Sequence, residues 1–173
     1  MTSNARAGIR ILCSLRSADG AGVVRMEERF DTDIDDLWSA LTDPSRLARW
    51  YGEVDGDLRP GGAFRLYIAA VDWTGGGRVE ACEPPRRLQV TTKELTEPYD
   101  KLIEATLSAD GEQTILVIEV HGMPLDKIAF YGAGWQLHAE NLAAYLAGRE
   151  RGDTEARLDD LVPQYQDLTT NIG

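Results

Sequence analysis

Residues 37–51 read LWSALTDPSRLARWY and carry the signals of two short helices in succession. Apolar residues recur at helical spacing from Ile34 to Leu41, which predicts an amphipathic helix behind an aspartate-rich first turn. Asp43 and Pro44 then supply a capping residue and a first helical residue, so a second helix is predicted to begin there. Two short helices on one side of a β region restrict the fold more than any other stretch of the chain.

The segment before these helices predicts a β-hairpin. Residues 22–30 alternate apolar and charged side chains, which is typical of an antiparallel strand with one wet face. Residues 9–12 are predicted to form an earlier strand, and residues 17–20, ending in Asp-Gly, the turn between the two.

A longer β region follows the two helices. Short connections between its predicted strands favour an antiparallel meander, because parallel strands need long crossovers. The glycine run at residues 74–77 is predicted to be a flexible turn. The strands are expected at residues 63–71, 78–82, 88–95, 102–107 and 114–121.

The last predicted element of the main domain is a long helix from Asp126 to about Gly148. Its apolar stripe, at steps of three and four, consists of Ile128, Tyr131, Trp135, His138, Leu142 and Tyr145. Residues 9–148 are therefore predicted to be one domain. Residues 149–173 are predicted to be a C-terminal appendage with a frayed end. Its weakly amphipathic segment before Pro163 is expected to form a short helix that docks on the domain.

The predicted fold class is α+β. A curved antiparallel sheet of six or seven strands must cover its apolar face, and the long C-terminal helix is the element with sufficient length. A curved sheet around a single helix leaves space between the two layers, and a ligand cavity is expected there.

The motifs along this order resemble a known family, the START-like (SRPBCC, helix-grip, Bet v-like) superfamily in its activator-of-heat-shock-protein-ATPase (AHSA-type) branch. The resemblance covers roughly residues 23–147, and none of its motifs is a catalytic signature. The segments that carry it are residues 37–51, residues 57–64 (DLRPGGAF), residues 77–88 (GRVEACEPPRRL), and Gly134-Trp135 with Leu142.

The charge of the chain excludes several classes of partner. With 29 acidic against 18 basic residues and a net charge of -11, the chain has no basic cluster for nucleic acid or for an anionic membrane. Cys13 and Cys82 are too few for a disulfide framework or a cysteine-rich zinc site. No signal peptide or membrane span is apparent, so a cytoplasmic location is expected, and the arginine-rich composition favours a bacterial, GC-rich genome.

The candidate ligand-binding residues are aromatic and polar side chains that the predicted fold brings toward the helix. Core packing is the alternative for each aromatic residue, and a local hydrogen bond is the alternative for each histidine. A metal site built from Glu119, His121 and His138 is conceivable but lacks supporting spacing, so no metal, cofactor or catalytic residue is predicted. The candidates are Trp50, Tyr67, Trp73, Glu119, His121, Tyr131, Trp135 and His138.

The predicted function is the binding of a small hydrophobic or amphipathic molecule in the cavity. Two alternatives follow from the resemblance: a co-chaperone-like protein-interaction module, with a chaperone partner implied by the family alone, and a cyclase- or aromatase-like enzyme. The enzyme requires His138 or Glu119 to face the cavity. A homodimer through a strand edge or the tail is left open by the sequence.

Overall fold

The computed structural model describes residues 10–69, 72–94, 101–150 and 152–170. It confirms the α+β helix-grip prediction, with one antiparallel sheet of eight strands where six or seven were expected. The sheet order is β1-β2-β8-β7-β6-β5-β4-β3. The strands are β1 (Cys13–Ala18), β2 (Ala21–Phe30), β3 (Glu53–Gly56), β4 (Ala63–Ile68), β5 (Trp73–Glu83), β6 (Arg87–Glu94), β7 (Lys101–Asp110) and β8 (Gln113–Met123).

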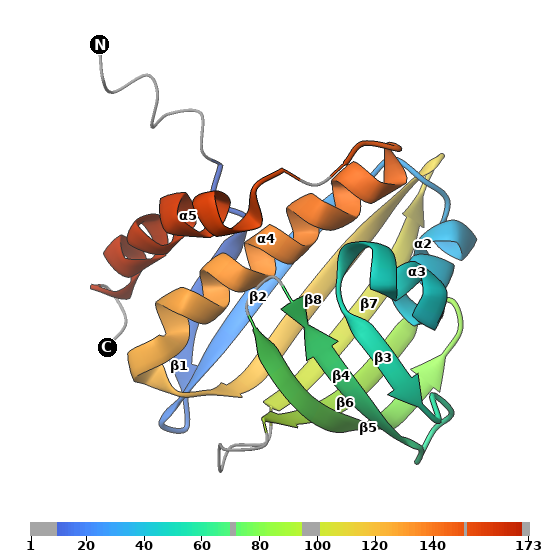
Figure 1. Ribbon diagram of the computed structural model, residues 1–173, viewed down its shortest axis with the longest axis horizontal. Coiled ribbons are helices and arrows are strands. Elements are labelled where there is room, and N and C mark those ends of the chain that lie inside the picture. The colour runs from blue at the N-terminus through green and yellow to red at the C-terminus, as the bar shows by residue number, and fades with distance from the viewer. Residues whose placement is uncertain (1–9, 70–71, 95–100, 151, 171–173) are drawn as a thin grey trace.

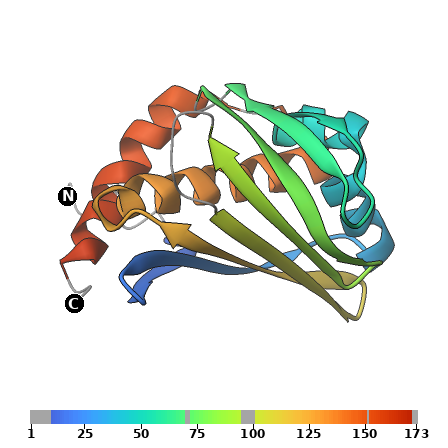
Figure 2. The same ribbon diagram turned by 90° about the horizontal axis from the view of Figure 1, so that it is seen from below.

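The helices cover one face and one end of this sheet (Figure 1). The sheet curves around α4, and α5 lies against α4 beside the β1 edge of the sheet (Figures 1 and 2). In the described part of the chain, no helix is both long and apolar enough to cross a membrane. The helices are α2 (Ile34–Thr42), α3 (Pro44–Trp50), the 3-10 turn η2 (Leu125–Lys127), α4 (Ile128–Leu146) and α5 (Thr154–Thr169).

The first strand lies later in the chain than predicted. Asp19 and Gly20 form the hairpin turn with positive φ, but β1 runs up to that turn, and residues 10–12 are not in a strand. The backbone N–H of Leu12 donates to Gln136 Oε1 at 3.1 Å, and Gln136 Nε2 donates to the carbonyl of Arg10 at 2.7 Å. A side chain from α4 thus satisfies the backbone groups that a strand would have paired. Residue 9 lies outside the described residues.

The predicted glycine turn is part of strand β5, and this prediction was wrong. Gly75 to Gly77 pair with β4 on one side and with β6 on the other. A Cβ at Gly77 would collide with the Phe64 ring, and one at Gly75 would collide with the Trp73 ring. These glycines therefore leave room for aromatic rings that pack closely across the strand. In the sequence alone, such a run of glycines looks the same as a turn.

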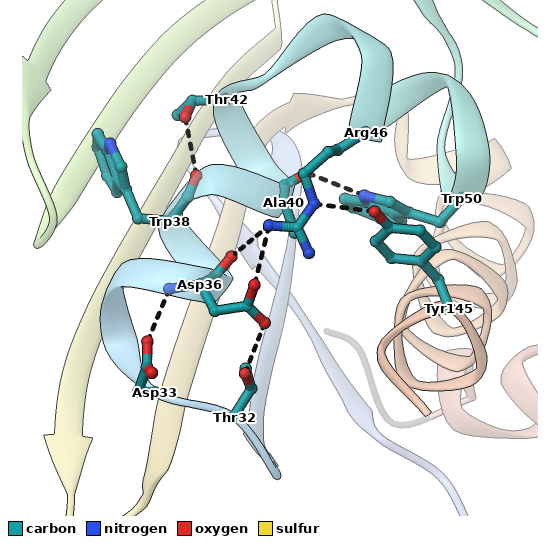
Figure 3. Close-up of polar contacts among 9 residues, drawn as sticks. All are labelled: Thr32, Asp33, Asp36, Trp38, Ala40, Thr42, Arg46, Trp50 and Tyr145. Atoms are coloured by element: carbon teal, nitrogen blue, oxygen red, sulfur yellow. Dashed lines mark hydrogen bonds and ion pairs between the residues drawn. The ribbon is translucent and has the colours of Figure 1, made fainter. Parts of the chain in front are cut away.

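The two short helices close one end of the sheet through polar contacts (Figure 3). Asp33 accepts from the backbone N–H of Asp36 at 2.8 Å and caps α2. Arg46 on α3 donates to the Asp36 carboxylate at 3.0 Å and to the Tyr145 hydroxyl at 2.8 Å. Trp50 Nε1 donates to the carbonyl of Ala40 at 2.9 Å. One arginine thereby connects α2, α3 and the end of α4.

Helix α5 packs against the main core, as expected of a helix that docks on the domain, and it is longer than the segment before Pro163 because it continues through the proline. Pro163 lies on the exposed side of the helix, where water can satisfy the carbonyl left without a donor. Leu161 and Tyr165 are fully buried on the other side. The Tyr165 hydroxyl donates to Gln136 Oε1 at 2.5 Å and accepts from the backbone N–H of Cys13 at 3.0 Å. The contacts of α5 with α4 and β1 make it integral to the folded body.

Candidate functional site

A cavity of about 400 Å³ lies between α4 and the concave face of the sheet. Strands β4 to β8 contribute its sheet wall, and α4 contributes the opposite wall. Asp72, Lys127 and Phe130 are exposed lining residues and mark the mouth. The interior walls are mostly apolar, so the site can take up an organic molecule and remove its apolar surface from water.

The sheet wall of the cavity carries a buried lysine. Lys101 is 3% exposed, and its Nζ lies 4.6 Å from the ring centroid of Tyr131 and 5.5 Å from that of Trp73. Thr92, which is 5% exposed, lies directly opposite Lys101 across the β6–β7 pair and also lines the cavity. Aromatic faces attract cations, so the two rings stabilise the ammonium inside the protein.

The helix wall carries a buried histidine. His138 packs edge-on against Tyr51, with 4.8 Å between ring centroids, and edge-on against Trp135 at 5.5 Å. Burial raises the pKa of the Tyr51 phenol well above its usual range, so Tyr51 stays a neutral hydroxyl. His138 and Tyr51 together place two polar groups on an otherwise aromatic wall.

Gly134 lies on the same wall, in the interior of α4 and buried. A Cβ built at this position meets no atom within 4 Å, apart from the helix backbone and its chain neighbours. The cavity thus reaches the helix backbone at Gly134, where any larger residue would reduce its volume.

A second, smaller cavity of about 160 Å³ lies on the side of α2 and α3 and is more apolar. It extends from the shared wall to Trp50, Phe64 and Val79. The side chains shared by both cavities, and therefore lying between them, are Tyr51, Leu66, Thr92, Ile103 and Trp135.

The structure brings together four of the eight predicted site residues. Trp73, Tyr131, Trp135 and His138 line the larger cavity. Trp50 lines the smaller cavity instead, and its ring also belongs to the core between α2 and α3.

The other three predicted residues lie away from both cavities. Tyr67 is 39% exposed and alternates with the buried residues of β4, so it points outward. Glu119 and His121 lie on the outer face of β8, since their neighbours on the inner face are the buried Val120 and Met123. Glu119 and His121 share one face of β8, but that face points to solvent and not toward α4.

Glu119 belongs to a charged cluster on the outer face of the sheet. It accepts from Arg16 at 3.2 Å and from His121 Nε2 at 2.8 Å, and Arg25 lies 3.7 Å away. Partial burial alone would raise the pKa of the Glu119 carboxyl, but the hydrogen bond and charge of Arg16, with His121, lower it below its usual value. Over the described ranges, no three His, Cys, Asp or Glu side chains are grouped to hold a metal ion.

Sequence reasoning missed Lys101, Thr92, Tyr51 and Gly134. A signal for Lys101 was present, because Ala105 and Leu107 continue its face of β7 at even spacing and are buried. A lysine at the start of that apolar face predicts an inward position. No comparable signal distinguishes Gly134 from Gly132.

Solved structures similar to this chain include two of CalU16 from Micromonospora echinospora. The crystal structure is 28% identical with a TM-score of 0.75, and covers 92% of this chain and 96% of that chain. The solution structure is 26% identical with a TM-score of 0.78, over 96% and 98%. DynU16, described as a protein in the dynemicin biosynthetic locus, is 27% identical with a TM-score of 0.69; the match covers 79% of this chain and 51% of DynU16.

No curated protein matches the sequence. The profile of the family described as activator of Hsp90 ATPase homolog 1-like protein matches residues 31–147, from the start of the two short helices to the end of α4. This span contains the cavity and all its walls, and it is well over half of the chain. The chain therefore belongs to the activator of Hsp90 ATPase homolog 1-like family.

Proposed function

We propose that this protein binds a small hydrophobic or amphipathic organic molecule in the larger cavity. The observation that carries the proposal is the cavity itself, about 400 Å³ between α4 and the sheet, lined by aromatic rings and a few buried polar groups. Sites for small organic ligands fall in the range of about 300–1,000 Å³ and have this mixture of apolar wall and sparse polar groups.

Gly134 adds support from energetics. Glycine in a helix interior is unfavourable by roughly 1 kcal/mol relative to alanine. Close packing does not require glycine there, because a Cβ would meet open space. Glycine at position 134 makes the helix less stable, and its benefit is that it leaves the cavity volume open. The similarity to DynU16 directs the search for the ligand toward natural products of biosynthetic loci.

The test compares ligand binding before and after the cavity is filled. A panel of lipids and polycyclic, polyketide-like aromatics is screened by thermal shift, and hits are measured by calorimetry. Gly134→Leu projects a side chain into the cavity, and Gly134→Ala is the matched control that leaves most of the volume. We expect hits to bind wild type and Gly134→Ala and to lose at least about tenfold in affinity for Gly134→Leu. No hit with wild type, or equal binding to Gly134→Leu, contradicts the proposal.

A second candidate, a cyclase- or aromatase-like reaction, is favoured by one observation: His138 is buried and lines the cavity, as that alternative required. An imidazole beside a bound carbonyl compound can transfer a proton to or from it. Each hit is incubated with the protein and examined by mass spectrometry for cyclised or dehydrated product. Conversion that persists in His138→Ala removes His138 from the reaction, and no conversion of any hit by wild type contradicts this candidate.

A further inference from the structure

The smaller cavity, to which the proposed function gives no role, has the properties of a binding site for an apolar group. Its described lining residues include no charged side chain, and each of them is buried or half-buried. The larger cavity differs in having exposed residues at its mouth. The volume of about 160 Å³ is close to that of an engineered apolar cavity of about 150 Å³ that stays dry and binds benzene. The smaller cavity therefore accommodates a group of about the size of a benzene ring.

The hydrogen-bonding side chains of the smaller cavity are either paired or shared with the larger cavity. The Thr42 hydroxyl and Trp50 Nε1 each donate to a backbone carbonyl of α2. Tyr51 and Thr92 carry the other hydroxyls among the described lining residues, and both residues also line the larger cavity. An occupant of the smaller cavity is thus surrounded by apolar groups and meets available hydroxyls at the end next to the larger cavity.

The two cavities are close enough for one molecule to occupy both. Tyr51 and Trp135 border both cavities from the helical side, and Leu66, Thr92 and Ile103 border both from three different strands. The Tyr51 and Trp135 rings stack on each other with 6.1 Å between their centroids. A ligand body in the larger cavity that packs against these side chains is separated from the smaller cavity by the thickness of a side chain.

We infer that the ligand has two parts: a body that binds in the larger cavity, and an apolar side group, such as a phenyl ring or a short alkyl chain, that binds in the smaller cavity. This inference rests on the proposed function and adds to it the class of the ligand, an alkyl- or aryl-substituted molecule. The atoms that link the two parts pass Tyr51 and Thr92, whose hydroxyls can donate to an oxygen at the link. The smaller cavity contributes to affinity by removing the side group from water.

The test uses a series of ketones in which the body is constant and the side group grows. Naphthyl methyl, naphthyl propyl and naphthyl pentyl ketones are measured by calorimetry with wild type. The methyl ketone reports binding of the body, and each further step adds two methylenes. We expect each step to tighten binding about tenfold, as the burial of two methylenes predicts.

A filled smaller cavity distinguishes this site from a general preference for apolar compounds. Ala105 is buried on β7 and lines the smaller cavity but not the larger one, so Ala105→Leu fills the smaller cavity. Ala109→Leu is the matched control, because it makes the same substitution at an exposed position of the same strand. We expect Ala109→Leu to keep the gain in affinity from methyl to pentyl ketone, and Ala105→Leu to reduce it to less than about threefold. An equal gain in folded Ala105→Leu and wild type overturns the inference.

Cys82 provides a second measurement, which needs no substitution. Its side chain is half-buried and lines the smaller cavity, whereas Cys13 is buried and lines neither cavity. A side group in the smaller cavity covers Cys82, so saturating pentyl ketone should slow alkylation of Cys82 by iodoacetamide at least about fivefold. The methyl ketone should slow it less than about twofold. Equal labelling of Cys82 with the two ketones overturns the inference, including where Ala105→Leu does not fold.

The outcomes separate the inference from the proposed function. If the methyl ketone binds wild type and the longer ketones bind no more tightly, the inference fails and the proposed function stands. The same conclusion holds if no ketone binds while other compounds of the wider panel do. If neither the series nor any compound of the panel binds wild type, both fail. Urea unfolding establishes that each variant folds.

Discussion

Two glycines in α4, Gly132 and Gly134, provide the most direct test of whether the cavity is truly unfilled. They lie two residues apart in the same helix interior, and both are buried. Adding a Cβ at Gly132 brings it to 2.8 Å from Cδ1 of Tyr165 and 3.0 Å from Cδ2 of Leu15. At Gly134 the same Cβ meets nothing within 4 Å. The two substitutions to alanine therefore differ only in what surrounds the new methyl group.

The expected free energies follow from two effects. Replacing glycine by alanine in a helix interior stabilises by roughly 1 kcal/mol, and this gain is common to both positions. At Gly134 nothing opposes it, so Gly134→Ala should raise the free energy of unfolding by about 1 kcal/mol and Tm by about 2–4 °C. At Gly132 the tyrosine ring must move, and overpacking of this kind costs about 1–3 kcal/mol. Gly132→Ala should therefore be neutral to about 2 kcal/mol less stable than wild type.

Urea unfolding followed by tryptophan fluorescence measures both variants, since the chain has four tryptophans. The difference between the variants is the informative quantity, because the helix-propensity gain cancels in it. We expect Gly134→Ala to be the more stable of the two by about 1–3 kcal/mol. Equal stability, or a more stable Gly132→Ala, would refute the assignment of open space to Gly134 and with it the basis of the cavity-filling experiment.

Two further predictions concern titratable groups. The hydrogen bond from the Thr32 hydroxyl and the hydrogen bond and charge of Arg46 outweigh partial burial and set the pKa of Asp36 below its usual value. Its carboxylate therefore stabilises the fold above the unfolded pKa of about 3.9, and this stabilisation is lost as pH falls through the folded pKa. Asp36→Asn should thus lower the free energy of unfolding more at about pH 7 than at about pH 3, and urea unfolding showing an equal loss at both would contradict this. Burial raises the pKa of the Cys13 thiol to about 11, whereas Cys82 is half-buried. A thiol reagent at about pH 8 should label Cys82 first and Cys13 only after unfolding, which mass spectrometry of peptides can check.

The fold was predictable because its signals are local. Helical spacing from Ile34 to Leu41, the Asp43-Pro44 start of α3 and the alternation in β2 each specify an element without reference to the rest of the chain. The misplaced elements depend on distant residues. Residues 10–12 lie outside the sheet because the Leu12 N–H and the Arg10 carbonyl hydrogen-bond to Gln136, which is more than 120 residues away in the sequence. The glycines of β5 make room for the rings of Phe64 and Trp73.

The candidate site was predictable only in part, for a related reason. Helical spacing identified Tyr131, Trp135 and His138 because they share one side of α4, and that side faces the cavity. The face of a strand cannot be assigned so simply when both faces carry mixed residues. Glu119 and His121 therefore went to the wrong side of β8, while Lys101 was missed on the inner face of β7.

The two sides of α4 explain how the protein tolerates an unfilled space in its interior. On the side facing α5, packing is complete: Gln136 bonds with Tyr165, Leu12 and Arg10, and Gly132 has no room for a methyl group. On the side facing the sheet, Gly134 borders open volume and Lys101 lies opposite in the sheet wall. Unfilled volume forfeits packing contacts, so the helix must be held by its other side. Helix α5 supplies that support through its contacts with α4, so the opposite side of the helix can border an open cavity.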